Sequence, residues 1–149
     1  QRSSQPHCAV IGLYDQHGHF RNVLRYAVKT WPGVLILRID ERLFFGNTVA
    51  VRRFGEAQLQ AHPDTRELIG RLSGVNDIDL SAQHMLQQLR EDLQQRHIGM
   101  SLTEVRATVS DALRKSPIWS LFEGRIFLST LDAVLTLTSM PSQEPEYQV

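Results

Sequence analysis

The chain has 149 residues, of which 42% are hydrophobic, and its 16 Lys and Arg residues balance 16 Asp and Glu residues. That length is enough for one packed domain. The charge balance provides no extended positive field for nucleic acid or an anionic membrane. We therefore expect a single globular unit without a nucleic-acid partner.

The two ends of the chain are polar and contrast with the part between them. Residues 1–7 lack the apolar core of a signal peptide, and no apolar run approaches the roughly 18 residues that cross a bilayer. We expect flexible tails at 1–7 and 141–149 around a domain at 8–140. The first residue is Gln instead of Met, which suggests a domain cut from a longer protein.

Two short β-rich runs open the domain. Residues 8–14 and 33–40 predict strands, and Trp31-Pro32-Gly33 predicts a turn before the second. The chain between them has no clean period, so we expect at most one short strand there. His17 and His19 could be two metal ligands, but without a third ligand at suitable spacing we interpret them as solvated loop residues.

Two further residue types are assigned to packing. Cys8, the single cysteine, is interpreted as a small buried hydrophobe, and its lack of a partner favours a reducing, cytosolic setting. Trp31 and Trp119 are interpreted as core or domain-contact residues instead of a ligand cage.

Apolar spacing in the next segment predicts a helix that ends before Pro63. The apolar positions are Ala50, Phe54, Ala57 and Ala61. Asn47 is available to cap the free amides at the start of this helix. Residues 67–75 then predict another strand, although Gly70 and Arg71 weaken it.

The clearest helix follows the stretch "VNDIDLSAQ". Its apolar stripe consists of Ala82, Leu86, Leu89 and Leu93. Residues 99–105 predict a strand, and Thr108 with Asp111 predicts a capping box for the helix after it. Ser116 and Pro117 start a short helix that Gly124 ends.

Residues 125–128 predict the last strand, and Ser129 with Asp132 is expected to cap a final helix. Strands that alternate with helices in this way indicate an α/β fold with helical crossovers.

The stretch "NDIDLS" has three interpretations, because it joins the carboxyl end of a strand to the amino end of a helix. Asp77 could be a nucleophile and Asp79 a general acid, as in haloacid-dehalogenase-like phosphatases. Asp79 could instead cap the helix by accepting the amide of Ser81 or Ala82. Ser81 could also be phosphorylated, and repulsion from Asp79 would then favour release of a partner.

Asn47 and Asp79 each begin a helix, and the two helix ends could approach one another. They would then form a shallow polar patch that tolerates anions. Nucleotide binding at this patch is only a weak possibility, because no Gly-rich phosphate loop accompanies it.

"VNDIDLSAQHMLQQLREDLQQRHIGMSLTEV" followed by "GRIFLSTLDAVL" resembles the STAS domain, which SulP anion transporters share with anti-sigma-factor antagonists. The resemblance runs from about Cys8 to Leu137. Leu80 occupies the position that matches the phosphorylated Ser or Thr of the antagonists. Since leucine cannot accept phosphate, the antagonist switch is expected to be absent.

"HFRNVLRYAVKTWPGVLILRIDERLFFGNT" is similar to the corresponding segment of SulP permease domains. The resemblance implies a central mixed β-sheet of about four to five strands with about four to five helices. It also implies a noncatalytic regulatory domain at the cytoplasmic face of the membrane, or of the inner membrane if the source is bacterial. Where permeases often carry an acidic residue this chain has Arg71, which could pair with Asp77 or Asp79.

The implied parent is a dimeric SulP-type transporter of sulfate, bicarbonate or a dicarboxylate. Its own transmembrane domain is the expected partner, with other cytoplasmic proteins as further candidates, and no metal or cofactor is expected. The predicted contact surface consists of Asn47, Asp77, Asp79, Leu80 and Ser81. A free-standing anti-sigma-factor antagonist is the first alternative, and a phosphatase is the second.

Overall fold

The fold is seen in a computed structural model that describes residues 7–139, so the predicted tails, apart from His7, lie outside the described residues. Six strands in this part form one sheet in the order β2-β1-β3-β4-β5-β6. The strands are β1 (Cys8–Leu13), β2 (Phe20–Asn22), β3 (Val34–Ile39), β4 (Glu67–Arg71), β5 (Gly99–Thr103) and β6 (Ile126–Phe127). The sheet thus has six strands, where the resemblance implied about four to five. Its two edge strands, β2 and β6, are very short.

The sheet is mixed, as predicted. Strands β3, β4, β5 and β6 run parallel, whereas β1 is antiparallel to both β2 and β3. The short strand expected between the first two runs is β2. Each parallel pair needs a crossover connection, and all three of these crossovers contain helices.

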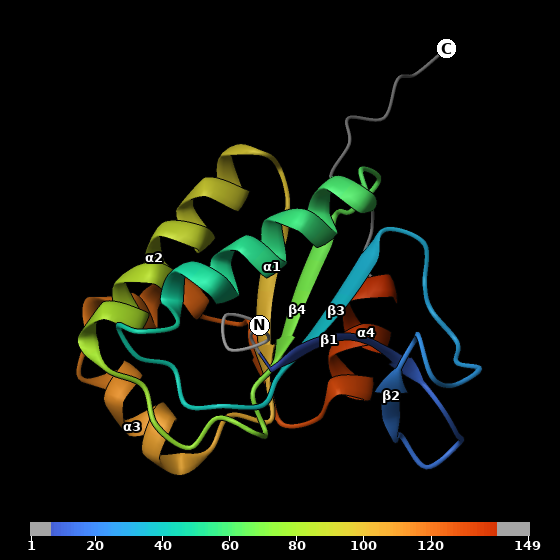
Figure 1. The fold of residues 1–149 in the computed structure, drawn as a ribbon, viewed down its shortest axis with the longest axis horizontal. Coiled ribbons are helices and arrows are strands. Elements are labelled where there is room, and N and C mark those ends of the chain that lie inside the picture. Colours follow the sequence, from blue (N-terminus) through green and yellow to red (C-terminus); the bar gives the residue numbers. More distant parts are fainter. Residues whose placement is uncertain (1–6, 140–149) are drawn as a thin grey trace, which may run out of the picture.

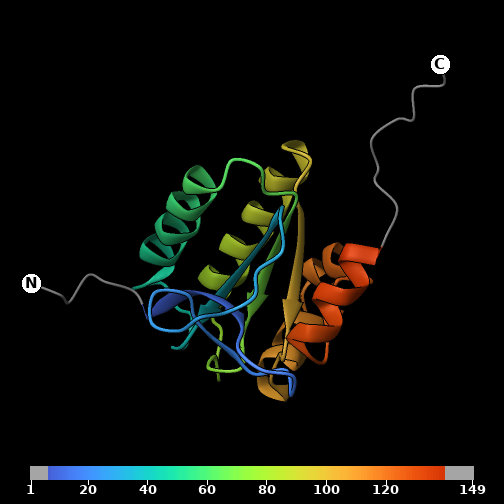
Figure 2. The ribbon, with the colours of Figure 1, turned by 90° about the vertical axis from the view of Figure 1, so that its right-hand side faces the viewer.

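Helices cover both faces of the sheet, as Figure 1 and Figure 2 show. The helices are α1 (Thr48–Ala61), α2 (Leu80–Gln95), α3 (Ala107–Arg114), the 3₁₀ helix η1 (Pro117–Phe122) and α4 (Thr130–Ser139). Helices α1, α2, α3 and η1 pack on one face and share the larger apolar core. Helix α4 packs on the other face over a smaller core. Trp31 and Trp119 are partly buried against the smaller and larger cores respectively.

The predicted apolar stripe of α1 was only partly correct. Phe54 packs against the larger core as predicted, but the buried positions are Val51, Gly55 and Leu59, and Ala57 and Ala61 are exposed. The pattern misled because Gly55, which has no side chain, holds a buried position and does not register as apolar. The stripe of α2 was predicted correctly, with Met85 as an additional buried residue.

At the ends of the later helices, two side-chain caps are present and one predicted cap is absent. Ser116 accepts the amide of Ile118, and Ser129 accepts the amide of Asp132 at 3.0 Å, as expected. The capping box at Thr108 was wrong. Its hydroxyl donates to the carbonyl of Asn76 at 2.8 Å, and α3 begins without a side-chain cap.

Cys8 lies partly buried at the start of β1, and burial raises the pKa of its thiol to about 12, with Glu41 and Asp40 adding to the rise. The neutral thiol is therefore favoured in the folded chain. Its contribution to stability is complete below the unfolded pKa of about 8.5 and is lost as pH rises towards 12.

We expect Cys8 to react far more slowly with a maleimide in the folded chain than in urea at about pH 8, because the thiolate is the reactive form. Mass spectrometry of timed samples measures both rates. Equal rates in the two conditions would show that the thiol is not protected.

Candidate functional site

Two loops lie side by side where β3 and β4 end. Leu43, in the loop after β3, forms a parallel bridge with Ile78, in the loop after β4. The Leu43 amide donates to the Asp77 carbonyl at 3.0 Å. Gly74 allows the close approach, because an added Cβ would lie 2.8 Å from the Cα of Asp40. The sheet thus brings together the amino ends of α1 and α2, which the sequence left as a possibility.

Asp79 connects the two loops and caps α2. One carboxylate oxygen accepts the Ala82 amide at 2.9 Å, as predicted for a cap. The other oxygen accepts the Phe45 amide, also at 2.9 Å, from the loop before α1. The Asp79 amide itself donates to the Leu43 carbonyl at 3.1 Å. A single carboxylate therefore fixes the position of Phe45 relative to the first turn of α2.

Asn47 precedes α1, but its side chain does not cap the helix as predicted. Its Oδ1 accepts the Phe44 amide at 3.0 Å, and its Nδ2 donates to the Arg42 carbonyl at 2.8 Å. The buried amide closes the loop on itself because both of its polar ends find partners within that loop. Asn47 is a structural residue of this site.

Three large apolar side chains are exposed to solvent near the junction of these two loops. Leu80 is 80% exposed, Phe45 is 78% exposed and Val49 is 61% exposed. Leu80 directly follows Asp79, Phe45 is hydrogen-bonded to Asp79, and Val49 lies in the first turn of α1. We call Phe45, Val49 and Leu80 the apolar triad. Exposed apolar groups that gather in one place mark surfaces that contact a partner.

Sequence reasoning found Leu80 and missed its two companions. The adjacent phenylalanines of "LFFGN" were the available signal, because they open a turn in which the Asn47 amide donates to the Phe44 carbonyl at 3.0 Å. Phe44 lies beneath the Arg42 guanidinium, 4.4 Å from its carbon to the ring centroid, while Phe45 faces solvent. The two neighbouring rings therefore have different surroundings, and Phe45 is the exposed one.

The remaining predicted residues have separate positions. Asp77 is exposed in the loop before α2, and Ser81 is exposed in the first turn of that helix. Arg71 does not reach either aspartate. It pairs with Glu104 at 3.1 Å, where Glu104 also accepts the Thr130 hydroxyl at 2.6 Å. The result is a polar link between β4 and α4.

The Asp79 carboxylate of "NDIDLS" is occupied by hydrogen bonds to the backbone. Both Asp79 oxygens hold backbone amides, so proton transfer by this group would release the cap and Phe45. Among residues 7–139, no group of three or more His, Cys, Asp and Glu side chains is placed to hold a metal ion. His19 pairs with Asp15 at 2.7 Å, and His17 is exposed.

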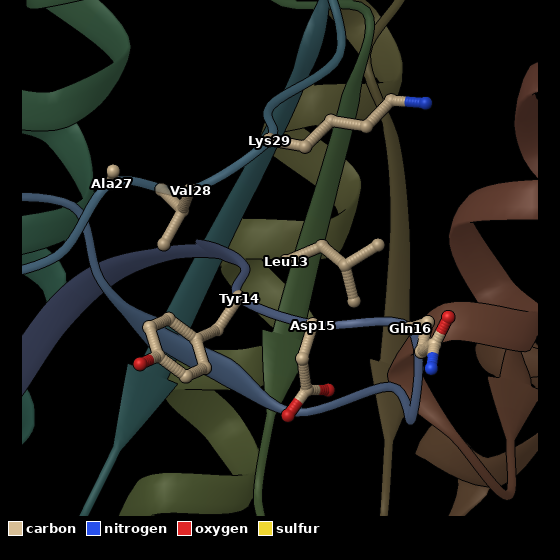
Figure 3. A pocket seen from close by; sticks show the side chains of 7 residues that line it. All are labelled: Leu13, Tyr14, Asp15, Gln16, Ala27, Val28 and Lys29. Carbon is tan, nitrogen blue, oxygen red and sulfur yellow. The ribbon is translucent and has the colours of Figure 1, made fainter.

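A shallow depression of about 460 Å³ lies elsewhere, beside the end of β1 (Figure 3). It is lined by Leu13, Tyr14, Asp15, Gln16, Ala27, Val28 and Lys29. Two of these lining residues, Leu13 and Lys29, are joined by an antiparallel bridge. The depression is thus separate from the apolar triad.

The STAS domain family model matches residues 25–133. The chain belongs to the STAS domain family. High affinity sulfate transporter 2 of Stylosanthes hamata is 30% identical over 144 residues, which cover 89% of this chain and 22% of that protein. This STAS domain therefore spans about a fifth of the length of that relative.

Solved structures share the STAS fold. The murine anion transporter SLC26A9 in its inward-facing state has a TM-score of 0.84 at 20% identity, covering 92% of this chain and 23% of that one. A sulfate transporter family protein from Wolinella succinogenes has a TM-score of 0.61 at 28% identity, covering 74% and 89%. The unphosphorylated anti-sigma factor antagonist SpoIIAA of Bacillus has a TM-score of 0.60 at 10% identity, covering 76% and 96%.

The helices of residues 7–139 include none with both the length and the apolarity to cross a bilayer.

Proposed function

We propose that this STAS domain is the cytoplasmic regulatory domain of a SulP-type anion transporter and that the apolar triad contacts the transmembrane part of its parent. Similarity to sulfate transporters over 89% of the chain supports the parent. The observation that supports the contact is that Asp79 holds two loops together by hydrogen bonds. Phe45, Val49 and Leu80 are exposed beside these loops. Sulfate, bicarbonate or a dicarboxylate would be the transported anion, in a dimeric parent.

Ser81 supplies a means of control in this proposal. It is exposed beside Leu80, so a phosphate there would put about two negative charges next to an apolar contact and to Asp79. We expect such a phosphate to release the partner. The proposal includes no nucleotide, because the negatively charged Asp79 carboxylate already accepts the Phe45 and Ala82 amides at this junction.

A binding assay tests the contact. We expect the isolated chain to bind the purified parent from which this domain has been deleted. Leu80→Ser should weaken that binding about tenfold, because removing a buried leucine side chain costs at least about 1.4 kcal/mol. Phe45→Ser should have a similar effect, and Ser81→Glu should weaken binding in the same direction. Titration calorimetry gives the dissociation constants.

Leu128→Ser is the matched control, because Leu128 is 94% exposed and follows β6, away from the junction. It should leave the dissociation constant unchanged. Binding by Leu80→Ser and Phe45→Ser that equals the wild type would contradict the contact. Proteoliposomes of the full parent that take up none of sulfate, bicarbonate and succinate would contradict the transporter assignment.

The antagonist alternative shares the fold and makes a different prediction. An antagonist would incorporate phosphate in the loop before α2 when incubated with its kinase. Leu80 stands where the resemblance places the accepting hydroxyl, which disfavours this alternative.

A further inference from the structure

The chain between β1 and β3, residues 14–33, projects past the β2 edge of the sheet, away from α1 and α2 (Figure 1). It contains Arg21, Arg25 and Lys29 but a single acidic residue, Asp15. The hydrogen bond from His19 lowers the pKa of the Asp15 carboxyl to about 2, so Asp15 stays charged and the segment has three cations against one anion. The overall balance of charge therefore conceals a local positive excess, which the expectation from composition did not include.

Leu24 is held out from the surface of this projection by an ordered turn. The Asn22 side chain accepts the Leu24 amide at 2.9 Å. The Asn22 carbonyl accepts the amides of Arg25 and Tyr26, each at 3.1 Å. Leu24 is 90% exposed. Its exposure is thus built into the turn and does not come from a loose loop.

Two tyrosines and two arginines flank Leu24 along this segment of the chain. Tyr14 and Tyr26 are each about half exposed, and their rings meet edge to face with centroids 5.3 Å apart. The Arg21 guanidinium carbon lies 5.8 Å from the centroid of the Tyr14 ring. The tip, defined here as Tyr14, Arg21, Leu24, Arg25 and Tyr26, thus combines one apolar group with two tyrosines and two arginines.

This combination matches the layers of an anionic lipid surface. Leucine enters the acyl region, tyrosine rings lie at headgroup level, and arginine binds lipid phosphate. A protein partner fits less well, because a stable interface buries about 800 Å² on each side and a projecting turn offers little flat area. Lipids, by contrast, can close around a projection.

We infer that the tip contacts an anionic membrane surface and orients the domain there. The inference deepens the proposed function and rests on it in one respect, which is that the domain works next to a membrane. The apolar triad lies at the amino ends of α1 and α2, so the contact with the transmembrane part and the contact with lipid use different residues.

Vesicle flotation of the whole chain tests this inference. We expect the chain to float with vesicles of phosphatidylcholine and phosphatidylserine but not with phosphatidylcholine alone, and to be released by salt. Replacing both arginines in Arg21→Gln/Arg25→Gln should lower the partition coefficient about 25-fold, or about fivefold for each charge. Leu24→Ser should lower it about tenfold.

Leu128→Ser is again the matched control, because Leu128 is equally exposed but follows β6, at the opposite edge of the sheet. It should float as the wild type does. Absence of phosphatidylserine-dependent flotation, or an equal loss in Leu128→Ser, overturns the inference. If the chain does not float with phosphatidylserine vesicles and Leu24→Ser weakens binding to the domain-deleted parent, the tip is a protein contact. The lipid inference is then wrong.

The two proposals fail separately. Vesicles contain no transporter, so flotation does not depend on the apolar triad, and Leu80→Ser should float normally. Loss of flotation would likewise leave the effect of Leu80→Ser on binding to the parent intact.

Discussion

Asp79→Ala is expected to lower the free energy of unfolding by about 2 kcal/mol. About half of this loss comes from the cap of α2, where the carboxylate accepts the Ala82 amide. The rest comes from the Phe45 amide, which loses its acceptor in the facing loop. Urea unfolding followed by circular dichroism measures the change, provided that the transition is two-state.

Two further variants separate the two roles of Asp79. Asp79→Asn keeps one oxygen for the Ala82 amide but faces Phe45 with an NH₂ group, so it should lose about 1 kcal/mol. Ser81→Ala, at an exposed neighbour, should change the stability by less than about 0.5 kcal/mol. If Asp79→Ala costs no more than Ser81→Ala, the carboxylate does not hold the two loops together.

The sequence was a good guide to several structural features that depend on nearby residues. The strands at β1, β3 and β5 are β-rich runs bounded by turn residues, and the caps at Asp79 and Ser129 join residues three positions apart. Such features follow from local geometry, which any chain with these residues would share. The same locality explains why the α2 stripe was predicted correctly.

Features that depend on distant residues were missed or wrongly assigned. The Asp79 carboxylate binds Phe45 across a separation of 34 residues, and Thr108 binds Asn76 across 32. Thr108 had the right residue type for a cap, but the distant Asn76 carbonyl competed for its hydroxyl. Asn47 also had the right residue type, but its side chain bonds within its own loop, to Phe44 and Arg42. A sequence pattern shows which groups can bond and does not show which neighbour the fold supplies.

The candidate site divides along the same line. Leu80 could be recognised as exposed, because the first turn of a helix offers a leucine little to pack on. Phe45 could not be added to it, because their proximity depends on the Leu43–Ile78 bridge between two separate loops. The positive excess near Leu24 was likewise invisible in a composition that sums to zero.

Leu43→Ala is expected to have the largest effect, lowering the free energy of unfolding by about 3 kcal/mol. Leu43 is almost fully buried in the larger core although it lies in a loop, and its removal leaves a cavity beneath that loop. Leu128→Ala, at an exposed position, should change the stability by less than about 0.5 kcal/mol. Urea unfolding compares the two variants.

Hydrogen exchange shows whether Leu43 also supports the site. The Leu43 amide donates to the Asp77 carbonyl, and the Leu43 carbonyl accepts the Asp79 amide. A more mobile backbone at Leu43 should therefore make the backbone at Phe45 more mobile as well. We expect the amides of Leu43, Phe45 and Asp79 to exchange faster in Leu43→Ala by more than the global loss of stability requires. If they follow the global loss alone, the loop is held by Asp79 and Asn47 without help from the core. Faster local exchange would show that burial of one leucine keeps Phe45 in the position from which it can contact a partner.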